Sequence, residues 1–451
     1  MPDRRTLVVG TTPDYIAYIY RQHPGRALFL TDTSQREGST EVKPDEASEI
    51  VCRLLDYEKV VKALEEHLQM KNQSLGGIAC YDCEWLSLAA RLATHFGLSF
   101  PSLQSVRLSR DKFLSKKRWA ESGVGCPRVE LVPTEWHALP LFERLGAPVV
   151  LKPPMGSGSE LTFKCRDRYD LTTAFRMIKT GLAQRGQQPM YHINPAGAGE
   201  CPPDQPVLAE EYIDGREYSA DFIIDHDDVT LVRVAKKLRC DALSFGTTVA
   251  YLVPARLPGR IRNEELQVTL SRAAQALGIT RAICMVDFII SDESIVLLEL
   301  TPRIGGDCLP PLIRKCCGLD TIGLALDFAE CRKYAIPERS LWKEHVGMRF
   351  FANQGGVLAG VNCEKLAEDP SVKEIFIKRA PGHEITLPPE DYDSWLLGHV
   401  IFEPHPDICL IRQCDDLREK IIINVEKYHD SRFAWFRSSG CRAAQSTGPA
   451  A

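Results

Sequence analysis

The stretch MVDFIISDESIVLLELTPRIGGD, residues 285–307, decides how the centre of this 451-residue chain folds. Two apolar runs flank the polar residues SDES at 291–294, which is the pattern of a β-hairpin. Asp287 and Glu299 lie twelve residues apart, one in each run, so the hairpin would bring the two carboxylates face to face. Adjacent carboxylates inside apolar strands repel each other unless a cation lies between them. The hairpin therefore predicts a bound cation.

The residue types favour magnesium. Mg²⁺ binds one or two carboxylates and prefers phosphate oxygens to a cage made wholly of protein. We therefore expect Asp287 and Glu299 to hold Mg²⁺, or Mn²⁺ in its place, against the phosphates of a nucleotide. Arg303 follows Glu299 by four residues, and we expect it to reach the same charge.

A lysine followed by a loop rich in glycine and serine lies upstream, in PVVLKPPMGSGS at residues 148–159. Lys152 ends an apolar strand, so its ammonium group can lie beside open backbone amides of the loop residues Ser157, Gly158 and Ser159. Phosphate oxygens need this combination of fixed positive charge and bare amide donors. The alternative is a lysine at a strand end before a flexible turn. The spacing is not that of a Walker A motif, which excludes a P-loop enzyme.

Asp287, Glu299 and Arg303, taken with PVVLKPPMGSGS and with AEEYIDGREYS at residues 209–219, resemble the ATP-grasp superfamily. Within it, the chain resembles the carboxylate–amine ligases of the L-amino-acid ligase type, with a biotin-carboxylase-like core. The resemblance runs to about residue 430 and rests on the order of the motifs. It implies ATP and Mg²⁺ as cofactors. It also implies a reaction in which a carboxylate becomes an acyl phosphate and an amine displaces the phosphate, with an amino acid or a related small molecule as substrate.

The resemblance assigns nucleotide contacts. It places Lys112 beside Lys152 on the phosphates, and residues 210–213 at the hinge between a lid and the main sheet. Backbone groups at the hinge would read the adenine edge, and Glu217 would accept hydrogen bonds from the ribose hydroxyls. The expected nucleotide-binding residues are Lys112, Lys152, Ser157, Gly158, Ser159, Glu210, Glu211, Tyr212, Ile213 and Glu217.

The resemblance assigns catalytic and metal-binding roles around Arg303. The planar guanidinium would hold the reacting carboxylate and stabilise the tetrahedral oxyanion, with Lys152 as the second catalytic cation. Gly305 and Gly306 would let backbone amides approach the same oxygens. Thr301 stands where the family usually has asparagine, and we expect its hydroxyl to join Asp287 and Glu299 as a metal ligand. A structural pair between Arg303 and Asp287 is the alternative.

The pattern of the whole chain predicts an α/β and α+β multidomain protein. Short strands alternate with helices near residues 14–22, 57–70 and 84–96, as in a doubly wound sheet. The expected parts are a Rossmann-like pre-ATP-grasp domain at 1–105, an ATP-grasp domain at 106–338 with a lid at about 128–208, a C-terminal domain at 339–435 and a disordered tail at 436–451.

Three finer expectations concern the later segments. The strands from Leu208 to about Arg332, AEEYI included, predict one large mixed sheet, and the chain is expected to start a new unit after Pro337. Residues 184–205 lack periodicity, which is typical of a loop that either covers an active site or is disordered. Lys236 and Lys237 point to opposite faces of a strand, so one of them can face the phosphates.

Composition excludes several classes of function. The net charge of −5 argues against nucleic acid as the main partner. No apolar run approaches the ~20 residues that span a bilayer, and the chain shows no export signal, so we expect a cytoplasmic protein that does not bind membranes. The 16 cysteines are expected to be reduced thiols rather than a zinc site. The expected partners are small-molecule carboxylate and amine substrates, and a homodimer is the expected assembly.

Two other functions remain open at this point. A biotin-dependent carboxylase subunit would use the same nucleotide fold with bicarbonate, although the chain has no Met-Lys-Met carrier site. A nucleotide-binding regulatory module without catalysis is the second, and the replacement of asparagine by Thr301 is its only support. His192, His345 and His383 are expected to be ordinary surface or core histidines.

Overall fold

A four-stranded parallel sheet forms the first part of the computed structural model, which describes residues 2–37, 39–186, 188–191, 206–259 and 261–427. The strands lie in the order β3-β2-β1-β4 and span β1 Asp3–Val9, β2 Ala27–Asp32, β3 Glu49–Cys52 and β4 Gln73–Ala79. Its helices are α1 Pro13–Gln22, α2 Thr33–Arg36, α3 Tyr57–Met70, the 3₁₀ turn η1 Cys83–Trp85 and α4 Leu86–Phe96. The predicted alternation of strands and helices is confirmed.

Two helices connect this sheet to the rest of the chain. They are α5 Leu103–Arg110 and α6 Lys112–Glu121. The carboxylate of Asp111 accepts hydrogen bonds from the backbone amides of Phe113 and Leu114, which caps the start of α6. Trp119 of α6 is fully buried and donates to the carbonyl of Ala273, so the helix is held firmly against the core.

A small antiparallel sheet with its own helices lies in the segment that was predicted to be a lid; we call it the lid sheet. Its strands lie in the order β5-β8-β6-β7 and span β5 Val129–Val132, β6 Val149–Lys152, β7 Phe163–Cys165 and β8 Val207–Glu211. Its helices are α7 Glu135–Ala138, α8 Leu141–Leu145, α9 Arg168–Arg185 and the 3₁₀ turn η2 Pro189–Tyr191. The expectation that AEEYI joins the large sheet was wrong, because β8 pairs with β5 and β6. At Gly215 a Cβ would lie 2.4 Å from the Ile290 carbonyl oxygen, and this tight turn separates β8 from the next strand.

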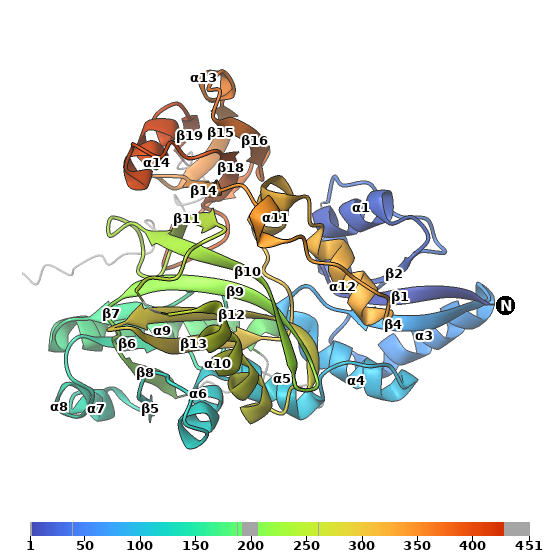
Figure 1. Cartoon of the computed structure of the whole chain (residues 1–451), viewed down its shortest axis with the longest axis horizontal. Helices are drawn as coiled ribbons and strands as arrows, with labels where there is room; N and C mark the ends of the chain where they lie inside the picture. The colour runs from blue at the N-terminus through green and yellow to red at the C-terminus, as the bar shows by residue number, and fades with distance from the viewer. Residues whose placement is uncertain (1, 38, 187, 192–205, 260, 428–451) are drawn as a thin grey trace, which may run out of the picture.

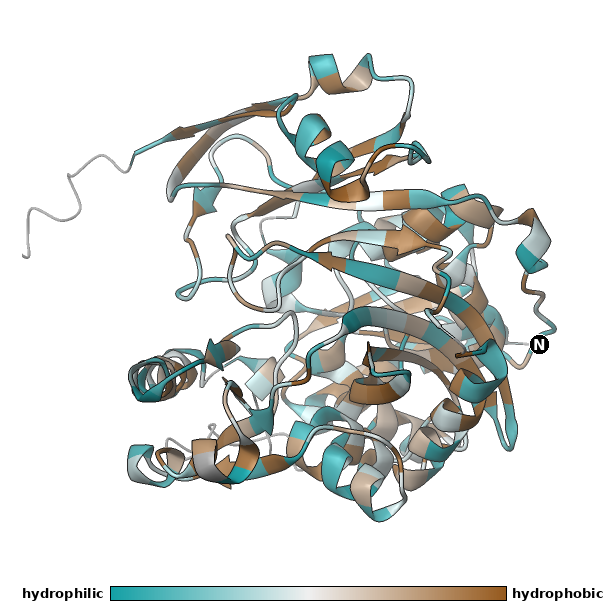
Figure 2. Ribbon diagram, turned by 60° about the vertical axis from the view of Figure 1, so that its left-hand side comes forward, coloured by the Kyte–Doolittle hydropathy of each residue, from teal (hydrophilic) through white to brown (hydrophobic). Residues whose placement is uncertain are grey.

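The centre of the molecule is an eight-stranded sheet in the order β13-β12-β9-β10-β11-β14-β18-β16. The strands are β9 Arg216–Asp225, β10 Asp228–Arg239, β11 Thr248–Val253, β12 Arg281–Ser291, β13 Ser294–Thr301, β14 His345–Phe351, β16 Val372–Ile377 and β18 Leu396–Phe402. Every neighbouring pair is antiparallel, so the prediction of a mixed sheet was wrong. Figure 2 shows hydrophobic residues recurring along these strands and the helices packed on them.

The segment after Pro337 continues the large sheet instead of starting a separate one. Strands β14, β16 and β18 extend it beyond β11. The remaining elements of this segment are the turn η3 Arg339–Leu341, α13 Glu364–Ala367, α14 Leu410–Arg418 and the small sheet of β15 Gly356–Asn362, β17 Glu384–Ile385 and β19 Ile422–Glu426. The proposed domain division at residue 338 therefore stays a prediction. The expected tail at 436–451, and residues 192–205 of the expected loop, lie outside the described residues.

Three helices complete the core: α10 Asn263–Ala276, α11 Leu309–Cys317 and α12 Thr321–Ala329. Helix α12 lies beside β4 of the N-terminal sheet (Figure 1) and joins the two parts of the molecule. Arg26 pairs with Asp327 at 2.8 Å and with Glu330 at 3.0 Å across this junction. The N-terminal sheet is therefore fixed to the core by charge as well as by packing.

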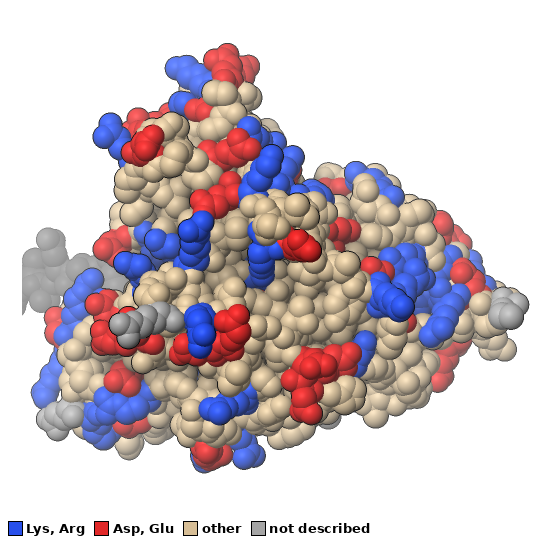
Figure 3. Space-filling view, viewed as in Figure 1, with Lys and Arg blue, Asp and Glu red and all other residues tan. Residues whose placement is uncertain are grey.

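Surface features bear on the classes of partner. On the face drawn in Figure 3, acidic and basic side chains are interspersed and do not form one broad patch of a single sign. Within the described ranges, no helix is long and apolar enough to span a bilayer. The described cysteines are free thiols.

The junction between β4 and α12 gives a stability prediction. A Cβ on Gly77 would lie 2.4 Å from the backbone oxygen of Ala329, which cannot move easily. We expect Gly77→Ala to lower the melting temperature, at a cost of about 1–3 kcal/mol from overpacking. The matched control is Gly360→Ala in β15, where a Cβ would meet no atom within 4 Å. Equal melting temperatures for the two variants would show that the close approach is absent.

Candidate functional site

The predicted hairpin is present and sets two acids opposite each other. Strands β12 and β13 pair antiparallel with Asp287 directly across from Glu299. The turn residues Asp292 and Glu293 have φ values of 47° and 61°, as a two-residue hairpin turn requires. Thr301 lies two residues after Glu299 in the same strand, so both side chains leave the same face of the sheet.

A cleft between the lid sheet and the large sheet collects most of the predicted nucleotide and metal residues. It encloses about 810 Å³, including the part that is open to solvent. Eleven of the predicted residues line it: Lys112, Lys152, Ser157, Ser159, Glu210, Glu211, Tyr212, Ile213, Glu217, Asp287 and Glu299. The lining does not include Gly158, Thr301, Arg303, Gly305 or Gly306.

The glycine- and serine-rich loop covers one end of the cleft. Gly156 and Gly158 have φ values of 141° and 66°, which a residue with a side chain rarely adopts. The loop is held by Lys112, which donates to the Gly156 carbonyl at 2.7 Å, and by the Ser159 hydroxyl, which donates to the Gly246 carbonyl at 3.0 Å. The amides of Gly156, Ser157 and Gly158 donate to no other described residue. Such open amides are suited to an anion.

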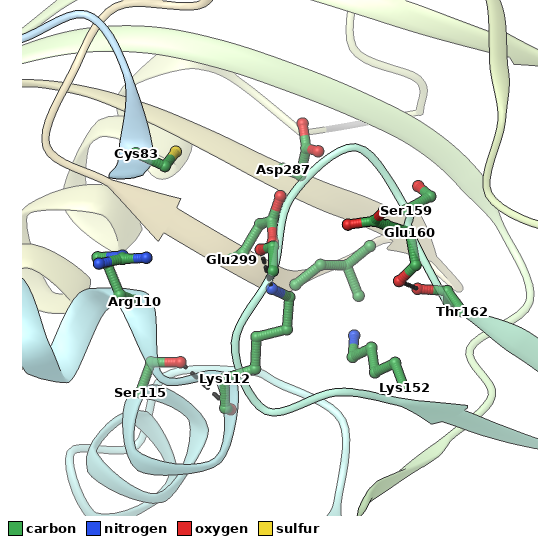
Figure 4. Close-up of polar contacts among 12 residues, drawn as sticks. Cys83, Arg110, Lys112, Ser115, Lys152, Ser159, Glu160, Thr162, Asp287 and Glu299 are labelled. Atoms are coloured by element: carbon green, nitrogen blue, oxygen red, sulfur yellow. Dashed lines mark hydrogen bonds and ion pairs between the residues drawn. The ribbon is translucent and has the colours of Figure 1, made fainter. Parts of the chain in front are cut away.

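Lysines lie close to both hairpin acids, and Figure 4 shows Lys112 beside Glu299. Lys112 lies 3.4 Å from Glu299, and Lys237 lies 2.9 Å from Asp287. Lys237 is thus the member of the Lys236–Lys237 pair that faces the site. Enclosure in the cleft raises the pKa of the Glu299 carboxyl, but Lys112, Lys152 and Lys237 outweigh this effect and lower that pKa to about 2. Both acids are therefore held in a strongly positive environment.

The two acids fit a magnesium ion. Asp287 is buried, and its Oδ1 atom has no hydrogen-bond partner among the described residues. Glu299 keeps about a third of its side chain exposed, at 34%, and lies directly opposite. Across the described ranges, no group of three or more His, Cys, Asp or Glu side chains could enclose a metal. Two carboxylates without further protein ligands are the usual protein contribution to a Mg²⁺ ion that also binds phosphate oxygens.

A buried triad lies beside the glycine- and serine-rich loop. Lys152 lies 2.8 Å from the Glu210 carboxylate, and Lys116 lies 3.2 Å from it. Lys116 also donates to the Leu298 carbonyl at 2.6 Å, and its side chain is fully buried. Burial lowers the pKa of Lys116, and despite the neighbouring Glu210 carboxylate the pKa falls to about 8. Glu210 is therefore a partner of two lysines and not a free acceptor at the hinge.

Lys116 was not among the site residues that we predicted from the sequence. It lies four residues after Lys112 in α6, which places the two ammonium groups on one face of the helix. That spacing was the available signal. A lysine on a helix is usually solvated, however, and only the packing of α6 against β13 shows that this one is buried.

The predicted hinge residues differ in how far their polar groups are already bonded within the protein. The Glu211 amide donates to the Arg128 carbonyl at 2.9 Å, and the Glu211 carboxylate pairs with the Arg128 side chain at 3.1 Å. The amide of Ile213 makes no hydrogen bond to another described residue. The Glu217 carboxylate pairs with Lys237 at 2.6 Å and also with Arg239. An incoming ribose would therefore share Glu217 with two cations.

Arg303 faces the N-terminal sheet and not the hairpin acids. Its Nε donates to the Cys83 thiol at 3.0 Å and its Nη1 donates to the Ile304 carbonyl at 2.7 Å. Within the described residues it forms no ion pair with Asp287 or Glu299, so the expectation from its spacing is not met. The physical reason is that β13 ends at Thr301, and the chain no longer alternates as a strand beyond that point.

The backbone amides of the two glycines after Arg303 differ in whether they are already hydrogen-bonded. The Gly305 amide donates to Asp221 at 3.1 Å, and Asp221 is paired with the buried Arg233 at 2.8 Å. The Gly305 amide is therefore already used, contrary to our expectation. The Gly306 amide has no partner among the described residues, so it keeps the predicted availability. Among the histidines, the ring of His383 contacts the Ser394 carbonyl and His345 lies near Glu403, both away from the cleft, and His192 lies outside the described residues.

Comparison with known proteins agrees with this geometry. Residues 145–311 match the ATP-grasp domain family. The L-amino acid ligase structure from Bacillus licheniformis superimposes with a TM-score of 0.71 at 16% identity, covering 95% of this chain and 100% of that one. A D-alanine–D-alanine ligase from Aromatoleum aromaticum is 27% identical over 231 residues, which is 49% of this chain and 66% of the relative.

An uncharacterised protein, y4rH, from Sinorhizobium fredii is 21% identical over 336 residues, which is 73% of this chain and 64% of that protein. The matches thus span slightly less than two thirds of these two relatives. At such low sequence identity, the structural superposition establishes the fold only, and the reaction has to be tested. The chain thus matches the ATP-grasp domain family over residues 145–311, and its multidomain α/β fold is similar to that of the L-amino acid ligase from Bacillus licheniformis.

Proposed function

We propose that the protein is an ATP-dependent ligase that activates a carboxylate as an acyl phosphate and joins it to an amine, with release of ADP and phosphate. The observation that carries this proposal is that one cleft holds the paired acids Asp287 and Glu299 together with an open amide loop and several lysines. That set matches the needs of nucleotide phosphates and their metal. The names of the D-alanine–D-alanine ligase and the L-amino acid ligase support amino acids as the substrate class.

The protein's part in such a reaction is positioning and charge compensation. Asp287 and Glu299, with Thr301, would hold Mg²⁺, which supplies charge neutralisation of the phosphates when it is bound. Lys112 and Lys152 would neutralise phosphate oxygens directly, and the amides of the glycine- and serine-rich loop would donate to them. We expect the lid to exclude water and so to protect the activated acyl group from hydrolysis.

In the first step, a carboxylate oxygen would form a bond to the terminal phosphorus as the bond to ADP breaks. In the second, the amine nitrogen would form a bond to the acyl carbon, phosphate would leave and the nitrogen would lose a proton. Arg303 would orient the carboxylate and stabilise the oxyanion of the second step, helped by the Gly306 amide. ATP supplies the activation, so the reaction fits a cytoplasmic enzyme, and a homodimer stays our expectation for its assembly.

The direct test is phosphate release from MgATP with pooled carboxylates that include amino acids, with and without pooled amines, and with the products read by mass. We expect ATP turnover to require both pools and a condensed mass to appear. Turnover that requires bicarbonate would favour the carboxylase alternative. Tight nucleotide binding without turnover in any pool would favour a regulatory module, and Thr301→Asn would be the next variant.

The metal assignment predicts the magnesium dependence of nucleotide binding. We expect Asp287→Asn and Glu299→Gln to raise the Mg²⁺ concentration needed for half-maximal nucleotide binding by roughly tenfold or more, since each removes one of few protein ligands. Calorimetric titration at a series of Mg²⁺ concentrations measures this without turnover. Asp292→Asn in the exposed hairpin turn is the control and should leave the dependence unchanged. An unchanged dependence in all three variants would refute the assignment.

The buried triad predicts a pH dependence. A lysine whose pKa is lowered to about 8 loses its charge as the pH rises through that value, so Glu210 then keeps only Lys152 as a charged partner. We expect nucleotide affinity to fall between pH 7.5 and 9 in the wild-type protein. Lys116→Met should weaken binding about tenfold at pH 7 and should flatten this profile.

Lys117→Met is the matched control, because Lys117 is the exposed neighbour of Lys116 in the same helix. It should reproduce the wild-type affinity and profile. If Lys116→Met kept the wild-type decline above pH 8, the decline would arise from another group and the role of the triad would be disproved.

A further inference from the structure

The end of the glycine- and serine-rich loop has an unusual backbone conformation. Ser159 and Leu161 have φ values of 62° and 53°. Residues with a side chain rarely adopt this left-handed region, and they keep it only where the surrounding structure fixes them. The Ser159 hydroxyl is fixed by the Gly246 carbonyl. The next residues, Glu160 and Leu161, are fixed by helix α9 and the turn η2.

Glu160 places a carboxylate in the wall of the cleft that collects the predicted nucleotide residues. A negative charge there would repel phosphate oxygens unless a cation compensates it. Arg185 supplies that cation, since its Nε atom donates to Oε1 of Glu160 at 2.8 Å. The Tyr191 hydroxyl donates to Oε2. Burial and the Glu160 carboxylate raise the pKa of the Tyr191 hydroxyl well above its usual value, so the hydroxyl keeps the proton that it donates.

Helix α9 and η2 also pack against both ends of the loop. A Cβ on Gly156 would lie 3.5 Å from the Tyr191 ring, and a Cβ on Gly181 of α9 would lie 2.7 Å from the Leu161 side chain. Leu161 is itself buried in the hydrophobic core of the lid sheet. The position of the loop is therefore set by the elements packed on it.

Arg185 extends these contacts to the C-terminal segment. Its side chain is almost completely buried, with the residue only 5% exposed. Besides its pairing with Glu160, the Nη2 atom donates to the carbonyls of Pro389, at 3.2 Å, and of Glu390. Tyr392 of the same segment packs against the core of the lid sheet. One guanidinium thus joins the end of the loop, helix α9 and the C-terminal segment.

We propose that Arg185 is a positioning residue for the nucleotide phosphates: it neutralises Glu160 and anchors the loop to residues 389–390, so that the loop amides stay available to phosphate oxygens. Arg185 is not among the residues that line the cleft, so it acts through Glu160. The inference rests on the nucleotide site of the proposed function and gives the C-terminal segment a part in that site. Coupling of this kind is reciprocal, so a bound nucleotide stabilises the contacts of residues 389–390 in turn.

The first test separates phosphate binding from base binding by calorimetric titration with MgATP and with adenosine. We expect Arg185→Met to weaken MgATP binding about tenfold or more, because the Glu160 charge is then uncompensated, and to change adenosine binding by less than about twofold. Adding Glu160→Gln to Arg185→Met should recover at least about threefold of the loss. Arg185→Lys keeps the charge but not the forked donors, so it should weaken MgATP by only about threefold, and it replaces Arg185→Met if that variant does not fold.

The matched control is Arg176→Met. Arg176 is an exposed arginine of the same helix that pairs with Glu135 at 3.0 Å. This variant should bind MgATP and adenosine as the wild-type protein does. Equal weakening of MgATP and adenosine by Arg185→Met would show a general loss of structure, and it would overturn the positioning role.

Hydrogen–deuterium exchange tests the anchor without turnover. In the wild-type protein, MgATP should slow exchange of the loop amides at 156–161 and also of the amides at 390–394. In Arg185→Met without nucleotide, the loop amides should exchange at least about threefold faster. MgATP should then no longer slow the amides at 390–394, whereas Arg176→Met should behave as the wild-type protein.

The outcomes separate this inference from the proposed function. If the wild-type protein binds MgATP and Arg185→Met binds it equally well, the positioning role is overturned and the proposed function stands. If the wild-type protein binds no MgATP, the proposed function fails, and exchange of the loop amides in the free proteins decides on the anchor. Faster exchange in Arg185→Met would support the anchor, and unchanged exchange would overturn it.

Discussion

Charge balance inside the cleft is the constraint on which the rest of the structure depends. Carboxylates removed from water need paired cations, and an unpaired partner is strongly destabilising. Each of the four acids Glu210, Glu217, Asp287 and Glu299 contacts at least one cation. Glu210 contacts Lys116 and Lys152, and Glu217 contacts Lys237 and Arg239. Asp287 contacts Lys237, and Glu299 contacts Lys112. These ion pairs join the lid sheet, helix α6 and the large sheet. The charges that face the cleft therefore also hold its walls together.

The same network explains how an anionic nucleotide could enter without a large rearrangement. The lysines already point into the cleft, and the loop amides are free of other described partners. Binding would therefore replace carboxylate contacts by phosphate contacts rather than build a new charged site. Lys116 contacts Glu210 and does not line the cleft itself, so in the proposed reaction it would be a positioning residue that acts through its neighbours.

The lid is also tied to the C-terminal segment. Glu160 directly follows the glycine- and serine-rich loop, and Arg185 of α9 pairs with it at 2.8 Å. The same guanidinium donates to the Pro389 carbonyl at 3.2 Å. The end of the loop is thus linked through Arg185 to residues far along the chain. No local sequence pattern relates these segments to one another.

Local sequence patterns predicted some features of the fold and of the candidate site, and contacts between distant segments decided the others. The hairpin, the opposition of Asp287 and Glu299 and the first βαβ units could be predicted from the sequence, because each depends on residues near one another and on strand or helix periodicity. The pairing of β8 within the lid, the antiparallel extension of the large sheet by β14, β16 and β18, and the burial of Lys116 depend on contacts between distant segments. The orientation of Arg303 toward Cys83 also depends on such contacts. We expected Arg303 to face the hairpin acids because side chains alternate along a strand, but β13 ends at Thr301, before Arg303. Local patterns thus indicated most residues of the candidate site, and only tertiary packing decided which of their charges meet, because those contacts join segments that lie far apart in the sequence.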